Sequence, residues 1–118
     1  MEPLKIGVVG PCASGKSTLI AGLQAHGHWG KHIAQEHSYV ANMWSRITHP
    51  DLLIYLDVSY PVSQQRRNMD WTEQEFEEQI RRLKDAREKA DFYLNTDNLS
   101  VEQVLEEVLA FLEQHRSE

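Results

Sequence analysis

The sequence predicts an α/β protein of three layers (α/β/α), in which a small parallel sheet of about four strands lies between two layers of helices. Short apolar segments alternate with helical segments along the chain, and strands separated by helical crossovers form parallel sheets. The run Leu52-Leu53-Ile54-Tyr55-Leu56 is typical of a strand buried on both faces of such a sheet. The length of 118 residues, with 41% hydrophobic and 25% charged residues, indicates a single globular domain over 1–118.

The first two predicted strands flank a helix. Residues 4–9 are apolar and partly β-branched, as in a strand, and residues 17–25 continue as a helix after a Gly-containing turn. Residues 27–30 end that helix, and a second strand is expected over 31–36, with Glu36 at its end.

A short helix and the central strand come next. Four apolar side chains recur at the spacing i, i+3, i+4, i+7 of one helix face, and the stripe stops before Pro50: Val40, Met43, Trp44 and Ile47. The central strand is expected over 51–59.

The following segment is predicted to be helical. Pro61 suits the first turn of a helix that runs to Arg67. Thr72 and Glu75 form a capping box for a long helix to about Ala90. Because the apolar stripe of this long helix is narrow, we expect it to lie at the edge of the sheet and to be able to move.

A fourth strand over 92–95 and a last helix complete the predicted fold. Ser100 and Gln103 are expected to cap this helix. Its core-facing side chains are predicted to be Val101, Val104, Leu105, Val108, Leu109 and Leu112.

Charge and composition exclude several classes of protein. The net charge is −6, so we expect neither nucleic-acid nor anionic-membrane binding. Residues 91–118 carry all of the excess negative charge. The longest apolar stretch, Leu52 to Leu56, is far shorter than the roughly 20 residues of a membrane-spanning helix. With Cys12 as the single cysteine and no leader-like start, the chain is expected to be cytoplasmic.

The turn after the first strand carries the strongest chemical signal. Residues 10–17 read G-P-C-A-S-G-K-S and match the pattern G-x-x-x-x-G-K-S between a strand and a helix. The glycines let backbone N–H groups surround a phosphate at the positive end of a helix. Lys16 adds a positive charge, and the Ser17 hydroxyl can ligate Mg²⁺. The predicted nucleotide-binding residues are Gly10, Pro11, Cys12, Ala13, Ser14, Gly15, Lys16, Ser17 and Thr18.

With this motif the chain resembles the P-loop nucleoside triphosphate hydrolases, and the order of its later segments is similar to their adenylate and thymidylate kinase-like branch. Residues 55–58 (Y-L-D-V) resemble the strand before the lid of those kinases, and residues 95–100 resemble the loop near the adenine. The resemblance implies binding of Mg²⁺ and ATP, and a lid-like segment over 61–90. Arg66, with Arg67 beside it, takes the position of the first lid arginine and would neutralise charge during phosphoryl transfer.

Two further arginines of the lid-like segment have two interpretations. Arg81 and Arg82 either fold over the triphosphate or form i, i+4 ion pairs with Glu77 and Glu78 that only solubilise a helix.

Two acids are candidates for the Mg²⁺ site. By pattern alone, the apolar run ending in Asp57 looks like a Walker B strand. The resemblance instead implies an acid on the strand before the lid strand, which makes Glu36 the favoured residue and Asp57 the alternative. Glu36 would orient Mg²⁺ or take a proton from an acceptor hydroxyl. The predicted catalytic residues are Lys16, Glu36, Arg66 and Arg67, and the predicted metal ligands are Ser17, Glu36 and Asp57.

The chain departs from this kinase branch between the first helix and the lid strand. The extra strand and the helical subdomain that hold the phosphoryl acceptor in those kinases have no counterpart here, so the strand order is expected to be 2-1-3-4. Two functions follow: a phosphotransferase acting on a small molecule or nucleotide, or a nucleotide-binding or slowly hydrolysing module acting with a protein partner or as a homo-oligomer. No zinc site is expected at His26, His28 and His32, which lack Cys or carboxylate partners at suitable spacing.

Overall fold

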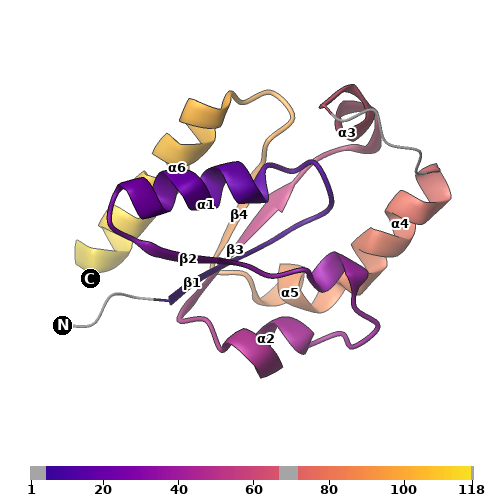
Figure 1. The fold of residues 1–118 in the computed structure, drawn as a ribbon, viewed down its shortest axis with the longest axis horizontal. Helices are drawn as coiled ribbons and strands as arrows, with labels where there is room; N and C mark the ends of the chain where they lie inside the picture. The colour runs from indigo at the N-terminus through magenta and orange to yellow at the C-terminus, as the bar shows by residue number, and fades with distance from the viewer. Residues whose placement is uncertain (1–4, 67–71, 118) are drawn as a thin grey trace.

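The protein folds around a four-stranded parallel sheet. The computed structural model describes residues 5–66 and 72–117, without the side chains of residues 47, 48, 116 and 117. The strands are β1 (Lys5–Val9), β2 (Trp29–His32), β3 (Leu52–Asp57) and β4 (Phe92–Asn95). Their order is β2-β1-β3-β4, and every neighbouring pair is parallel (Figure 1), which confirms the predicted order.

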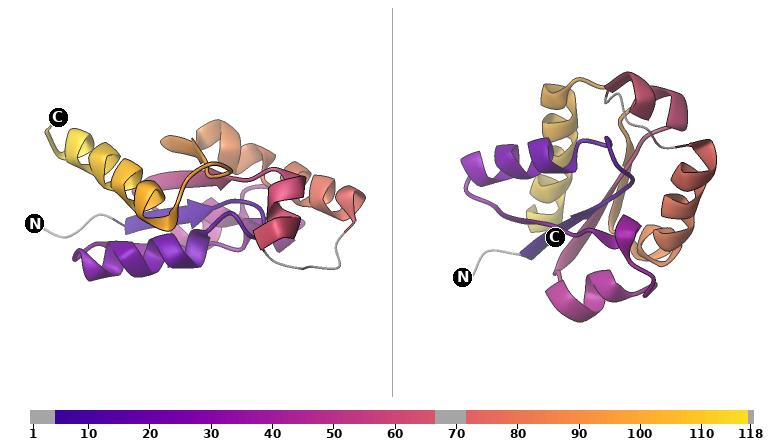
Figure 2. Two further views of the ribbon diagram at one scale, coloured as in Figure 1. Left: turned by 90° about the horizontal axis from the view of Figure 1, so that it is seen from above. Right: turned by 45° about the vertical axis from the view of Figure 1, so that its right-hand side comes forward.

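Helices cover both faces of the sheet (Figures 1 and 2). Helices α1 (Lys16–Ala25) and α6 (Val101–Ser117) share one apolar cluster with one face of the strands, and α2 (Met43–Thr48) and α5 (Lys84–Lys89) share another with the opposite face. Two further helices, α3 (Tyr60–Arg66) and α4 (Glu73–Arg82), lie at the end of the sheet where the strands finish. The predicted layers are therefore present.

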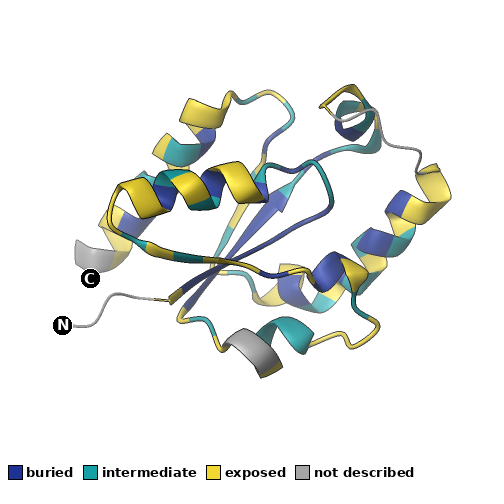
Figure 3. Cartoon of the chain, in the orientation of Figure 1, coloured by how far each residue is buried: buried dark blue, intermediate teal, exposed yellow. Residues whose placement is uncertain are grey.

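Successive side chains of β3 point to opposite faces of the sheet, so this one strand contributes to both apolar clusters. Leu52, Ile54 and Leu56 pack towards α1 and α6, whereas Leu53 and Tyr55 pack on the side of α5. All five side chains are buried, as the continuous apolar run predicts (Figure 3). Because all strands are parallel, their carboxyl ends meet at one edge of the sheet, where open α/β proteins place their ligands.

The second strand lies earlier in the chain than predicted. It spans Trp29–His32 rather than 31–36, and Glu36 belongs to a short 3₁₀ helix, η1 (Gln35–His37). The buried side chain of Gln35 anchors η1 to its surroundings. Its amide donates to the carbonyls of Val40 (2.9 Å) and Arg82 (3.0 Å), and its Oε1 accepts from the backbone N–H of Trp44 (2.9 Å). These bonds hold the turn after β2 against α2 and α4.

The predicted long helix to Ala90 is broken at Leu83, which separates α4 from α5. The change of direction lets Leu83 and Ala86 pack with Val9 and Leu53 in the core. The expectation of a helix that covers little core is therefore wrong for α5.

The other helix predictions agree with the structure except at two residues, and the side chain of the predicted core residue Ile47 lies outside the described part. The capping boxes Thr72–Glu75 and Ser100–Gln103 are both present. Val40 lies before α2 and is exposed, and Val101 is exposed at the start of α6, so neither joins the core. Across the described ranges, no helix has the length and apolar character needed to cross a membrane.

Candidate functional site

Residues 10–15 form a tight loop between β1 and α1. Gly10 has φ +152°, and a Cβ on it would lie 2.0 Å from the Leu56 carbonyl oxygen, so only glycine fits where the loop passes the end of β3. Gly15 has φ +102° and begins α1 with no side-chain cap. The first-turn N–H groups of α1 therefore face outward without a capping side chain, at the positive end of the helix dipole.

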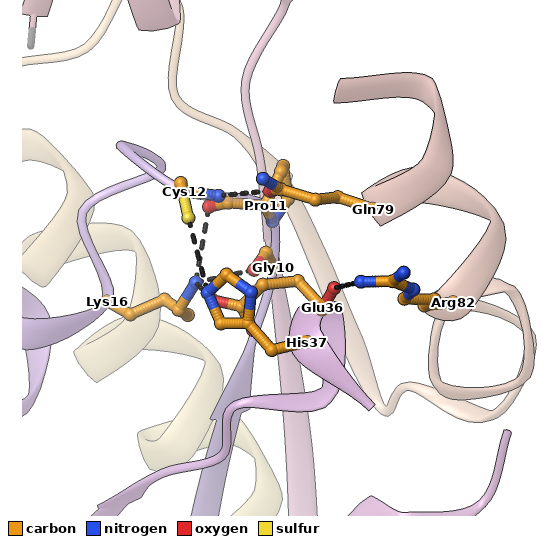
Figure 4. Close-up of polar contacts among 8 residues, drawn as sticks. All are labelled: Gly10, Pro11, Cys12, Lys16, Glu36, His37, Gln79 and Arg82. Atoms are coloured by element: carbon orange, nitrogen blue, oxygen red, sulfur yellow. Dashed lines mark hydrogen bonds and ion pairs between the residues drawn. The ribbon is translucent and has the colours of Figure 1, made fainter. Parts of the chain in front are cut away.

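Lys16 lies beneath this loop and is almost fully buried. Its Nζ donates to the carbonyl oxygens of Gly10 and Pro11 and forms an ion pair with Glu36 Oε2 at 2.8 Å (Figure 4). The positive charge needed for phosphate binding is thus held at the carboxyl edge of the sheet, in contact with the loop and with η1.

Glu36 presents a second, unused carboxylate oxygen. The residue is 2% exposed, and Oε1 has no hydrogen-bond partner among the described residues. Buried polar atoms are nearly always paired, and Glu36 Oε1 is one of a few described buried side-chain atoms without a hydrogen-bond partner, with the Ser14 and Tyr55 hydroxyls among the others. Carboxylate and hydroxyl oxygens suit a hard cation such as Mg²⁺, and Ser17 lies in the first turn of α1 with its side chain exposed.

The alternative acid, Asp57, has different partners. Its carboxylate accepts from the Val58 N–H at 2.9 Å and from the Tyr93 hydroxyl. The Tyr93 ring stacks on Tyr55, with centroids 5.6 Å apart. Burial and the hydrogen bond to Asp57 raise the pKa of Tyr93. In the described part of the chain, the carboxylate paired with Lys16 is that of Glu36 and not that of Asp57.

Arg66 connects the loop to the end of β4. Its guanidinium donates to the Ala13 carbonyl (3.1 Å), to the Thr96 hydroxyl oxygen (2.9 Å) and to the Thr96 carbonyl. The predicted lid arginine thus links the loop to the residue that follows β4. Arg67, its predicted partner, lies outside the described residues.

A small pocket opens beside the loop, between the start of α1 and the segment before α6. Its lining residues are Ser14, Gly15, Thr18, Leu19, Leu99, Val101 and Val104. Leu99 belongs to the segment 95–100, which the resemblance to the kinases predicts to lie near the adenine. The pocket and the uncapped start of α1 are adjacent, since Gly15 and Thr18 contribute to both.

Helix α4 supplies Gln79, which the sequence did not assign to the site, and Arg82, which the sequence offered as a possible lid arginine. The buried Gln79 accepts the Cys12 N–H at 3.1 Å, and Arg82 donates to the Glu36 carbonyl at 3.3 Å (Figure 4). Gln79 lies at helical spacing between two buried apolar residues, Phe76 and Leu83. A polar side chain within an apolar stripe was the available signal, although spacing alone does not identify its partner.

The two arginines at the end of α4 differ in their surroundings. Arg81 pairs with Glu78 at 2.5 Å on the exposed side, instead of with the predicted Glu77. Arg82 lies 3.6 Å from the same Glu78 and places its guanidinium 4.5 Å from the centre of the Tyr39 ring. Only Arg82 also contacts η1.

His37 is a further residue that the sequence did not assign to the site. Its Nε2 lies 3.7 Å from Cys12 Sγ and 3.9 Å from Glu36 Oε2 (Figure 4). Within the described ranges, these three side chains form the one group of Cys, His and acidic donors close enough to share a metal ion. His26, His28 and His32 are not part of it. Burial and the nearby charge of Lys16 lower the pKa of His32.

The residues of the site indicate which kind of ligand it suits. In comparisons with known proteins, no protein-family model matches the chain and no curated protein does. The edge of the sheet combines an anion-binding helix start, a buried lysine, an unpaired carboxylate oxygen and a bracing arginine. That combination suits a polyanion accompanied by a divalent cation.

Proposed function

We propose that this chain is a small protein of the P-loop nucleoside triphosphate hydrolase type, similar to the nucleotide kinases, that binds ATP with Mg²⁺. The observation that carries the proposal is the buried ion pair between Lys16 and Glu36, which joins the G-x-x-x-x-G-K-S loop to the acid predicted for the metal. The parallel sheet and the positive φ of Gly10 support it, because a phosphate-binding loop at this edge requires both.

Each residue has a defined task in this proposal. The N–H groups at the start of α1 bind phosphate oxygens, and Lys16 exchanges Glu36 and the loop carbonyls for the β- and γ-phosphates. Ser17 and Glu36 would hold Mg²⁺, which neutralises phosphate charge when bound. The unpaired Oε1 of Glu36 is the observation that fits a cation at this position. The pocket at Thr18 and Leu99 offers room beside the loop for part of the nucleoside.

Arg66 acts first as a brace in this scheme. Its bonds to Ala13 and Thr96 hold the loop against β4, and it would have to leave them to neutralise charge on a transferring phosphoryl group. Glu36 can accept a proton from an acceptor hydroxyl only when Lys16 is paired with another group. A bound triphosphate would provide that group.

The second function, a nucleotide-binding or slowly hydrolysing module, is favoured by a specific feature of the fold. Strand β2 pairs directly with β1, and only residues 33–42 separate β2 from α2. This connection holds a single turn of 3₁₀ helix and no acceptor-binding subdomain. A protein partner or a second copy of the chain would then complete the site.

Turnover in the presence of acceptors separates the two functions. For a phosphotransferase we expect ADP release from Mg·ATP to rise at least about tenfold when one class among nucleosides, nucleotides or sugars is added, because positioning an acceptor lowers the barrier by more than about 1.4 kcal/mol. ADP would be measured by a coupled assay, with the Lys16→Ala protein as the background. A rate that no acceptor changes would assign the chain to the module class.

A further inference from the structure

We infer that Cys12, Glu36 and His37 form a binding site for a thiophilic divalent cation of the Zn²⁺ class, distinct in its chemistry from the Mg²⁺ site proposed above. The three side chains come from two places in the fold: Cys12 from the loop after β1, and Glu36 and His37 from η1. Their donor atoms all lie within 4.8 Å of one another.

The separations between donors fit tetrahedral coordination. Zn–S bonds of about 2.3 Å and Zn–N bonds of about 2.0–2.1 Å, at the tetrahedral angle, place sulfur and nitrogen about 3.6 Å apart. Cys12 Sγ and His37 Nε2 are 3.7 Å apart. The corresponding nitrogen-to-oxygen separation is about 3.4 Å, and His37 Nε2 lies 3.9 Å from Glu36 Oε2. The third separation, between Cys12 and Glu36, is at most 4.8 Å, and side-chain rotation would have to shorten it together with the separation between His37 and Glu36.

The kinds of donor select a softer ion than Mg²⁺. A thiolate, an imidazole and a carboxylate are a set that binds Zn²⁺ and its neighbours, whereas Mg²⁺ prefers oxygen ligands. Binding converts the Cys12 thiol to a thiolate, and the proton passes to solvent. The Glu36 oxygen measured against His37 is Oε2, which also pairs with Lys16, so a bound ion would share this carboxylate with the lysine.

Hydrogen bonds hold the backbone at two of the donor residues, Cys12 and Glu36, and the third, His37, is accessible to solvent. Gln79 fixes the Cys12 backbone, and Arg82 binds the carbonyl of Glu36. The side chain of His37 is 51% exposed, which gives an ion a route from solvent. A built site with one open side suits three protein ligands and a water.

Because Glu36 belongs to both proposed sites, binding of Zn²⁺ would affect nucleotide binding. If the proposed function is correct, a bound Zn²⁺ takes the carboxylate needed for Mg·ATP, and the cation would inhibit. This consequence rests on the proposed function, whereas the metal site itself does not.

The test uses the full chain, without nucleotide, and Co²⁺ as a spectroscopic substitute for Zn²⁺. We expect one equivalent of Co²⁺ to produce the near-ultraviolet charge-transfer absorption of a cobalt–thiolate bond, and one equivalent of Zn²⁺ to remove it. Cys12→Ser, which keeps size and polarity, should lose the band. His37→Gln should weaken Co²⁺ binding at least about tenfold, as loss of a metal ligand does.

The matched control is His115→Gln, which removes an exposed histidine of α6 and should leave both the band and the affinity unchanged. Circular dichroism of each variant reports on folding. A wild-type chain that binds Co²⁺ without the thiolate band, or equal affinity in the wild type and His37→Gln, would overturn the inference. Because no nucleotide is present, failure of ATP binding would not alter this result.

Discussion

Replacing Lys16 with alanine is expected to reduce ATP affinity by about 30-fold to several thousand-fold. Removing one partner of a buried, hydrogen-bonded charge pair costs about 2–5 kcal/mol, and each 1.4 kcal/mol is a factor of about ten in affinity. Lys16 is 6% exposed, and its ammonium group contacts the loop carbonyls directly. Isothermal titration calorimetry with Mg·ATP measures the change.

The effect of the substitution on folding must be measured separately from its effect on ATP binding. Lys16→Ala leaves the buried Glu36 carboxylate without the ammonium group that lies 2.8 Å away in the wild type. Lys16→Gln keeps hydrogen-bond donors near that carboxylate but removes the charge, and it should lose affinity while keeping the wild-type circular dichroism spectrum. Lys31→Ala removes the same charge from an exposed position on β2 and should bind like the wild type. Unchanged affinity in a folded Lys16→Gln protein would refute the role of Lys16.

Replacing Glu36 with glutamine is expected to weaken ATP binding at least about tenfold when Mg²⁺ is present, because even residues that only orient metal ligands contribute about 10- to 100-fold to metal affinity. In the absence of Mg²⁺ the affinity should stay the same or increase. The reason is that Lys16 no longer has to break an ion pair to reach the phosphates. Titrations with and without Mg²⁺ should therefore show a loss of ATP affinity only when Mg²⁺ is present.

Asp57→Asn is the control for the metal assignment. The carboxylate of Asp57 is bonded to the Val58 N–H and to Tyr93, so we expect its substitution to leave the Mg²⁺ dependence unchanged. If the loss of Mg²⁺ dependence appeared in Asp57→Asn and not in Glu36→Gln, the metal role would belong to Asp57.

Local patterns predicted much of the fold. The apolar run of β3, the two capping boxes and the glycine-rich turn identified their elements because each depends on neighbouring residues. The order of the strands followed from the short connection before α2.

Features that depend on long-range contacts were not predictable in the same way. The break at Leu83 arises because Leu83 and Ala86 pack on Leu53 and Val9, which helical spacing does not reveal. Glu36 was assigned to a strand, whereas it lies in η1, where the buried Gln35 is bonded to the distant Arg82 carbonyl. Gln79 is joined to the loop by a contact across 67 residues, so its role required the structure.

The most direct test of nucleotide binding is a calorimetric titration of the unmodified chain with ATP, with and without Mg²⁺. We predict saturable binding of one ATP per chain that is tighter with Mg²⁺, because Ser17 and Glu36 then hold the cation beside the phosphates. Absence of saturable binding at millimolar ATP, with the protein folded by circular dichroism, would contradict the proposal.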